Sequence, residues 1–186
     1  MSRSEKEKML ANEPYLASDP QLVRERERAR RLCALYNATA PDHLARRDEL
    51  LWELLGFAGD NVRIEPPFLC DYGTHIRLGD GVYLNFGCVF LDCNAIHLGD
   101  AVQFGPAVQV YTAYHPVDPE LRRTGLELSA PVRIGNNVWV GGGAILCPGV
   151  EIGDDTTIGA GSVVTRSIPA GVLAVGNPCR VVRRVK

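Results

Sequence analysis

The 186-residue chain lacks the sequence features that mark several large classes of protein. No apolar run approaches the roughly 20 residues that cross a bilayer, and the charged segment Met1 to Lys8 does not resemble a signal peptide. The six cysteines have neither CxxC spacing nor the density of a disulfide framework. A net charge of −2 gives no basic excess for binding nucleic acid. We therefore expect a cytoplasmic protein with free thiols and with neither a membrane nor a nucleic-acid partner.

Several catalytic motifs are also missing. The sequence contains no GxxxxGK[ST] phosphate-binding loop, no GxGxxG after a leading strand, no HExxH and no GxSxG. The run Gly141-Gly142-Gly143 could suggest a phosphate cradle, but Gly141 falls on a structural repeat. Flat backbone at Gly142 and Gly143 would instead let an extended ligand lie against the chain.

The second half of the chain contains a repeat of six residues. One set of small or aliphatic positions recurs every six residues from Val132 to Ile168, and a second aliphatic set lies two places after each. The second set is Ile134, Val140, Leu146, Ile152, Ile158 and Val164. Neither a helix, with a period of 3.6, nor paired strands, with a period of 2, produces this spacing. A hexapeptide repeat is typical of a parallel β-helix, whose inward residues stack coil upon coil.

Residues 1–57 do not share the repeat and are predicted to be a helical segment, followed by the β-helix over 58–186 with a C-terminal tail. One helix is expected from Pro20 to Tyr36. Its apolar side would comprise Leu22, Ala29, Leu32, and Leu35 or Tyr36. A second helix opens at Pro41-Asp42, with Asp42 as a possible N-cap and Gly56 near its end. Its predicted apolar stripe is Leu44, Leu51, Trp52 and Leu55.

Two surplus segments interrupt the repeat in its first coils. They are 70–74, with the sequence Cys-Asp-Tyr-Gly-Thr, and 91–95, with the sequence Leu-Asp-Cys-Asn-Ala. Surplus residues in a stacked coil must bulge at a corner, and these two lie about one coil apart. We therefore expect Asp71 and Cys93 to lie close together on one edge.

A longer interruption, the extruded loop 112–131, contains His115 followed by Pro116. Long segments without regular structure in compact domains are usually functional. The proline biases His115 toward an extended backbone, and histidine is the usual general base at neutral pH. A solvated loop histidine is the other interpretation of His115. The remaining histidines, His43, His75 and His97, are expected at the surface.

The chain resembles the maltose and galactoside O-acetyltransferases of the hexapeptide-repeat acyltransferase group, and it is nearer to the maltose branch. The similarity covers essentially the whole sequence. Its motifs are Glu65-Pro66-Pro67, Cys70-Asp71-Tyr72-Gly73, Asn85-Phe86, Leu91-Asp92, Tyr111-Thr112-Ala113-Tyr114-His115-Pro116, Ile134-Gly135-Asn136-Asn137-Val138-Trp139 and Gly176-Asn177-Pro178-Cys179-Arg180. Ala17 and Cys93 depart from the galactoside branch, which tends to carry acidic residues there, so the acceptor is not specified.

The resemblance implies a left-handed parallel β-helix that forms a homotrimer and binds acetyl-CoA between subunits, with no metal. His115 would be the catalytic base for attack of an acceptor hydroxyl, of a sugar such as maltose or glucose, on the thioester. The implied acceptor-binding residues are Asn85, Asp71, Tyr83 and Glu127. The implied coenzyme A-binding residues are Gly142, which would also donate its N–H to the oxyanion, Ala160, Thr165, Arg166, Arg180 and Arg183. From the residues alone, Asn85 fits a corner ladder as well as a ligand contact.

Three alternatives stay open at this point. The acceptor could be a non-sugar hydroxyl compound or an amine. The β-helix could be a non-catalytic binding module, with its basic C-terminal residues simply solvated. A zinc hydro-lyase on the same fold would need His75, His97 and His115 to converge on one metal ion.

Overall fold

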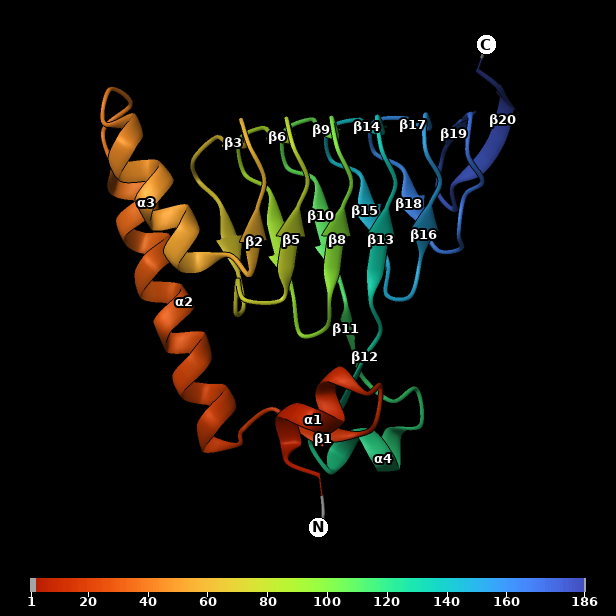
Figure 1. The fold of residues 1–186 in the computed structure, drawn as a ribbon. Helices are drawn as coiled ribbons and strands as arrows, with labels where there is room; N and C mark the ends of the chain where they lie inside the picture. Colours follow the sequence, from red (N-terminus) through yellow and green to blue (C-terminus); the bar gives the residue numbers. More distant parts are fainter. Residues whose placement is uncertain (1–2, 186) are drawn as a thin grey trace.

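Short parallel strands wrap around one apolar core in the computed structural model, which describes residues 3–185 (Figure 1). The first sheet comprises β2 (Phe57–Ala58), β5 (Ile76–Leu78), β8 (Ile96–Leu98), β13 (Val132–Ile134) and β16 (Glu151–Ile152). The second comprises β3 (Arg63–Ile64), β6 (Tyr83–Leu84), β9 (Gln103–Phe104), β14 (Trp139–Val140), β17 (Thr157–Ile158), β19 (Val172–Val175) and β20 (Arg180–Arg184). The third comprises β4 (Leu69–Cys70), β7 (Val89–Leu91), β10 (Gln109–Tyr111), β15 (Ile145–Leu146) and β18 (Val163–Val164).

The chain visits the three sheets in turn, so each coil has three sides and the predicted β-helix is confirmed. Both six-residue sets point inward: Val132 and Val138 are buried, as are Ile134 and Val140 two places later. The stacked aliphatic side chains form one continuous core along the coils. Burial of apolar surface is the main force holding coils of two- and three-residue strands together.

Helices cover the end of the stack where the first coil begins (Figure 1). α2 (Pro20–Ala38) confirms the first predicted helix; it buries Leu22, Ala29, Leu32, Cys33 and Tyr36, whereas Leu35 is exposed. The expectations for α3 (Leu44–Leu54) were partly wrong. His43, not Asp42, is its N-cap and makes no capping bond, and Leu44 and Trp52 are exposed while Leu50 and Leu54 are buried. Leu51 and Leu55 of the predicted stripe are buried as expected, so the buried side of α3 is shifted from the prediction by part of a turn.

The N-terminal arm consists of α1 (Glu5–Leu10) and β1 (Tyr15–Leu16). No helix within residues 3–185 is both long enough and apolar enough to span a bilayer.

The extruded loop is more regular than expected. It contains β11 (Ala113–Tyr114), the short helix α4 (Pro119–Arg123) and β12 (Leu126–Ser129). β12 pairs antiparallel with β11 on one side and with β1 on the other. The loop therefore stands away from the coils as a small three-stranded sheet that also holds the N-terminal arm (Figure 1).

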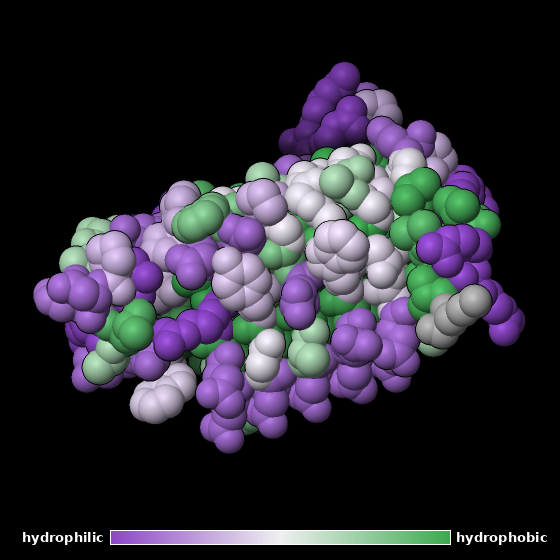
Figure 2. Space-filling model, turned by 90° about the horizontal axis from the view of Figure 1, so that it is seen from above, coloured by the Kyte–Doolittle hydropathy of each residue, from purple (hydrophilic) through white to green (hydrophobic). Residues whose placement is uncertain are grey.

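The corners between the first and second sheets are closed by a ladder of side chains. Asp80 Oδ1 accepts a hydrogen bond from the Asp60 N–H at 2.8 Å, and Asp100 Oδ1 accepts one from the Asp80 N–H at 2.9 Å. Asn136 and Asp154 continue the pattern in the next coils. Figure 2, which looks onto the side where β3, β6 and β9 are labelled in Figure 1, shows hydrophilic side chains projecting along one edge of the stack. The ladder provides hydrogen-bond acceptors for backbone N–H groups at the corners, which lie outside the strands.

Candidate functional site

The predicted site residues fall mainly on two corners of the coil. At the corner between the second and third sheets lie Asn85, Gly142 and Ala160, which follow β6, β14 and β17. At the corner between the third and first sheets lie Asp71, the extruded loop with His115 and Glu127, and Thr165 and Arg166. The third sheet lies between these two corners. Within one chain, Asn85 and His115 therefore lie at different corners, with the third sheet between them.

The corner bearing Asn85 and Gly142 is a flat backbone surface. A Cβ on Gly105 would meet the Gly142 nitrogen at 2.5 Å, and one on Gly141 would meet the Ala160 nitrogen at 2.4 Å, so these coils stack tightly. The Gly142 carbonyl accepts a hydrogen bond from the Gly161 N–H at 2.9 Å. Within residues 3–185 no acceptor pairs with the Gly142 N–H. Such a backbone donor is available to an oxyanion or to the amide-bearing arm of coenzyme A.

Asn85 lies at the same corner but holds its own turn. Its Oδ1 accepts a hydrogen bond from the Phe86 N–H at 2.8 Å, which leaves its side-chain amide as a donor. Tyr83 lies two residues earlier on the outer face of the second sheet. The register of that sheet aligns Tyr83 with Arg63 and Gln103, and Gln103 with Trp139. Trp139, the last residue of a motif that carries the family resemblance, is 57% exposed on this face.

The two bulged corners meet as predicted. The Cys93 thiol donates to Asp71 Oδ2 at 3.6 Å, which confirms that the surplus segments lie side by side. Burial raises the pKa of Asp71, while Cys93, Arg26 and Arg30 act in the opposite direction and the charge of Glu127 adds to the rise. Burial also raises the pKa of the Cys93 thiol, which stays neutral beside Asp71.

Glu127 belongs to the same cluster. Tyr15, a fully buried residue of the N-terminal arm, donates its hydroxyl hydrogen to Glu127 Oε2 at 2.9 Å. The pairing of β1 with β12 sets Tyr15 opposite Glu127. Asp71 and Glu127 thus line one corner as hydrogen-bond acceptors, a composition that suits a hydroxyl-bearing ligand. The contribution of Tyr15 was not apparent from the sequence, because 112 residues separate it from Glu127.

His115 is exposed and directly follows β11. β11 and β12 pair Ala113 with Ser129 and Tyr114 with Leu128. Extending this register by one residue sets His115 opposite Glu127. His115 therefore lies just after β11, at the edge of the Asp71–Glu127 corner, and the following Pro116 limits its backbone.

The predicted coenzyme A-binding residues lie toward the C-terminal coils. Ala160, Thr165 and Arg166 are exposed, the last two immediately after β18. Arg180 and Arg183 are exposed on β20, which pairs antiparallel with β19. Their guanidinium groups bond only to the main-chain carbonyls of Cys179 and Arg184 within the described chain, so both can also bind phosphate.

The three histidines of the zinc alternative do not converge. His75 was expected at the surface but is largely buried, with Nδ1 paired to the Asp92 carbonyl oxygen at 2.7 Å, and burial lowers its pKa. His97 lies on the outer face of the first sheet, and His115 lies in the loop. Across residues 3–185, no three His, Cys, Asp or Glu side chains form a metal-binding group.

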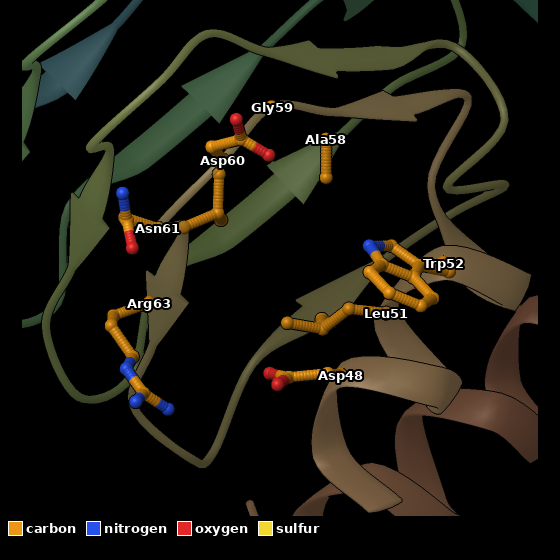
Figure 3. Close-up of a pocket in the computed structure, with 9 residues that line it drawn as sticks. Asp48, Leu51, Trp52, Ala58, Gly59, Asp60, Asn61 and Arg63 are labelled. Carbon is orange, nitrogen blue, oxygen red and sulfur yellow. The ribbon is translucent and has the colours of Figure 1, made fainter. Parts of the chain in front are cut away.

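A separate cavity of about 330 Å³ lies between α3 and the first coil (Figure 3). Trp52, Asp48 and Leu51 of α3 face Arg63 across it, and Ala58 to Val62 complete the lining. None of the predicted site residues lines this cavity.

Comparisons with known proteins agree with the β-helix fold. Residues 8–59 match the maltose acetyltransferase hexapeptide capping motif, and residues 131–166 match the bacterial transferase hexapeptide model with six repeats. The chain is 54% identical to nodulation protein L of Rhizobium leguminosarum bv. viciae over 97% of its own length and 95% of that protein.

Solved structures match over almost the whole chain. A maltose O-acetyltransferase from Clostridium difficile 630 is 47% identical with a TM-score of 0.98 and 100% coverage of both chains. A galactoside acetyltransferase in complex with coenzyme A is 37% identical, with a TM-score of 0.96 over 100% of this chain and 92% of that one. The hexapeptide-repeat acetyltransferase VCA0836 of Vibrio cholerae, complexed with acetyl-CoA, is 36% identical, with a TM-score of 0.92 over 99% and 100%.

Proposed function

Because the chain belongs to the maltose and galactoside O-acetyltransferase family of hexapeptide-repeat acetyltransferases, we propose that it transfers the acetyl group of acetyl-CoA to a sugar hydroxyl. The observation that carries the proposal is the placement of His115 beside the Asp71–Glu127 corner. The carboxylate oxygens of Asp71 and Glu127 can accept hydrogen bonds from the hydroxyl groups of a sugar bound there. Acetyl-CoA and coenzyme A in the related structures support the choice of donor.

In the proposed reaction His115 removes the proton of the acceptor hydroxyl as its oxygen attacks the thioester carbonyl. The Gly142 N–H donates to the oxyanion that develops on that carbonyl. The C–S bond then breaks, the new ester leaves, and the departing thiolate takes the proton from His115 as free coenzyme A. No acyl-enzyme is required, because the attacking group belongs to the acceptor.

Asn85, Asp71, Tyr83 and Glu127 bind the acceptor in this proposal, and Ala160, Thr165, Arg166, Arg180 and Arg183 contact coenzyme A together with Gly142. The backbone surface at Gly142 and Ala160 supports the assignment of the pantetheine arm. The exposed guanidinium groups of Arg180 and Arg183 support that of the phosphates.

We also propose that the chain acts as a homotrimer whose sites form between subunits. The outer face of the third sheet supports association, because its register aligns Leu69, Val89, Gln109, Ile145 and Val163 in one largely apolar row. The equivalent row of the first sheet is Phe57, Arg77, His97, Arg133 and Glu151. An apolar row on the surface favours association with another copy of the chain. Because the row lies between the corner with Asn85 and the corner with His115, association there would bring residues of different subunits together.

The acceptor panel that tests the proposal comprises glucose, maltose, galactosides, amino sugars, serine and chloramphenicol, with thiol release from acetyl-CoA as the readout. We expect one sugar to show the highest kcat/KM. Fastest transfer to serine, chloramphenicol or an amine would move the acceptor outside sugar hydroxyls. Binding of coenzyme A without release on any compound would contradict sugar acetylation and favour the binding module.

A further inference from the structure

The carboxyl group of Asp92 lies beneath the acceptor-side corner and has no role in the reaction described above. Asp92 directly follows β7 in the second bulged corner, and its side chain is 0% exposed. Its Oδ1 accepts hydrogen bonds from two successive backbone N–H groups in the preceding coil, those of Asp71 at 3.0 Å and Tyr72 at 2.8 Å. Asp92 therefore bonds the backbone of Asp71, the residue whose side chain is proposed to bind the acceptor.

A third bond strengthens the link between the two corners. The carbonyl oxygen of Asp92 pairs with His75 Nδ1 at 2.7 Å, at the far end of the Asp71–His75 segment. The bulge carries this segment away from the strand ladder that joins the coils, which ends with Cys70 opposite Phe90. The Asp71 N–H also donates to the Phe90 carbonyl oxygen at 3.3 Å, as the last bond of that ladder. Asp92 therefore adds a second acceptor for the Asp71 N–H and bonds Tyr72 and His75, which lie beyond the ladder.

The charge state of Asp92 suits this role. Burial raises its pKa to about 8, and the neighbouring charge of Asp71 acts in the same direction. The raised pKa favours the neutral acid, in which Oδ1 accepts the two backbone hydrogen bonds, while Oδ2 is buried without a hydrogen-bond partner within residues 3–185. An ionised carboxylate in this position would repel the charge of Asp71.

We infer that Asp92 is a positioning residue for the acceptor site, which acts by holding the Asp71 backbone so that the Asp71 carboxylate meets the acceptor hydroxyl. The inference rests on the proposed function, because it needs Asp71 to bind the acceptor. The Cys93 thiol, which donates to Asp71 Oδ2, then holds the side chain of the same residue. Two consecutive residues, Asp92 and Cys93, set the backbone and the carboxylate of Asp71 respectively.

The test compares Asp92→Ala, Asp92→Asn and the matched control Asp100→Ala in steady-state kinetics with both substrates varied. Asp100 bonds an amide of the preceding coil in the same way at a corner away from the site. We expect Asp92→Ala to raise the acceptor KM at least tenfold and to leave the acetyl-CoA KM within twofold. Asp92→Asn keeps a neutral acceptor oxygen and should restore the acceptor KM to within threefold of wild type. Asp100→Ala should lower thermal stability without changing either KM.

A double-mutant cycle with Asp71→Ala identifies the path of the effect. If Asp92 acts through Asp71, the double variant should be no worse than Asp71→Ala alone. Additive losses, an unchanged acceptor KM in Asp92→Ala, or an equal rise of the acetyl-CoA KM would each overturn the inference while leaving the proposed function intact. No thiol release by the wild type with any acceptor would overturn both.

Asp92→Ala removes a buried contact, so its folding is checked by circular dichroism. Where it does not fold, hydrogen exchange of the wild type and Asp92→Asn provides the second measurement. The Asp71 and Tyr72 amides should exchange at least tenfold more slowly than the exposed Thr74 amide in both proteins. Fast exchange of the two amides in the wild type would show that Asp92 does not hold them and would overturn the inference.

Discussion

At the residue scale, the corner that holds Asp71 brings together two acids, a thiol and an imidazole whose pKa values are shifted mainly by burial. Burial raises the pKa values of Asp71, Asp92 and Cys93, while His75, bonded to the same corner, has its pKa lowered. These shifts favour the neutral forms that a water-poor corner can hold. The same shifts make the stability of the fold depend on pH.

Asp92 gives the clearest pH prediction. Its pKa is about 8 in the folded chain against 3.8 when exposed, so the folded state binds one more proton between these values. The contribution of protonated Asp92 to the free energy of unfolding is therefore fully present below pH 4. It falls by about 1.4 kcal/mol per pH unit as the pH rises toward 8. We expect the free energy of unfolding of the wild type, relative to Asp92→Asn, to fall from pH 5 to pH 7 in urea titrations. Since Asp71, Cys70, Cys93 and His75 surround Asp92 in both proteins, the difference isolates Asp92. Parallel curves for the two proteins would contradict the shifted pKa.

Sequence reasoning reached some of these residues and missed others. The proximity of Asp71 and Cys93 followed from counting surplus residues, because stacked coils align equivalent bulges. His75 was misplaced at the surface, because its position in the repeat is outward and only the bulge folds it back beneath Asp92. Asp92 was noticed only as part of a motif and of a surplus segment, and Tyr15 was not noticed, because the partners of both come from another coil or a distant segment.

At the element scale, the six-residue repeat predicted the coils and their inward residues, whereas the weaker patterns of α3 and the extruded loop did not predict their structure. The six-residue spacing identified the inward residues, because each aliphatic position meets its counterpart in the next coil. α3 has only three turns and two possible apolar sides, and contact with α2 selected Leu50 and Leu54 over Leu44 and Trp52. The extruded loop lacked periodicity because its strands pair with β1 and with each other rather than with the coils.

The corners between the first and second sheets allow a matched test of backbone strain. Gly81 has a φ of 66° with nothing near its missing Cβ, whereas Ala101 has a φ of 55° at the equivalent corner of the next coil. We expect Gly81→Ala to lower the free energy of unfolding by about 1 kcal/mol, the usual cost of a left-handed residue with a Cβ. Ala101→Gly should raise it by less, because glycine gains freedom in the unfolded chain.

Gly79→Ala is the control for steric clash in the same corner, measured by the same urea titration. Its Cβ would lie 2.7 Å from the Gly99 carbonyl carbon, so this change should cost more than Gly81→Ala. Equal losses at the two positions would argue against strain as the cause at Gly81.

At the scale of the whole molecule, the third sheet separates two groups of predicted site residues, and the proposal that sites form between subunits rests on this separation. Asn85 and Gly142 lie on one side of the apolar third sheet, and His115 and Glu127 on the other. The period predicts the coil but neither its hand nor its association, so both of those expectations came from the family resemblance. To predict association from the residues, one must know which outward side chains form an apolar row, and only the strand register shows which of them are aligned.

Mixing two inactive chains tests the proposed arrangement between subunits. When His115→Ala and Asn85→Ala chains are refolded together in equal amounts, an intact site needs one subunit of each kind in the right order. Random assembly into closed trimers should therefore restore about a quarter of wild-type thiol release. Each variant alone should stay inactive, and light scattering should give the mass of three chains. No recovery in mixed trimers would place both residues in the site of a single chain.

The central claim is that His115 removes the acceptor proton, and thiol release by His115→Ala tests it most directly. Loss of a general base should lower kcat by about 10² to 10⁴-fold. Coenzyme A affinity by calorimetry and the oligomeric mass should match the wild type, because the imidazole is exposed and its removal leaves no cavity in the core. A near-normal kcat in this variant, with the sugar that gives the highest kcat/KM, would contradict the account.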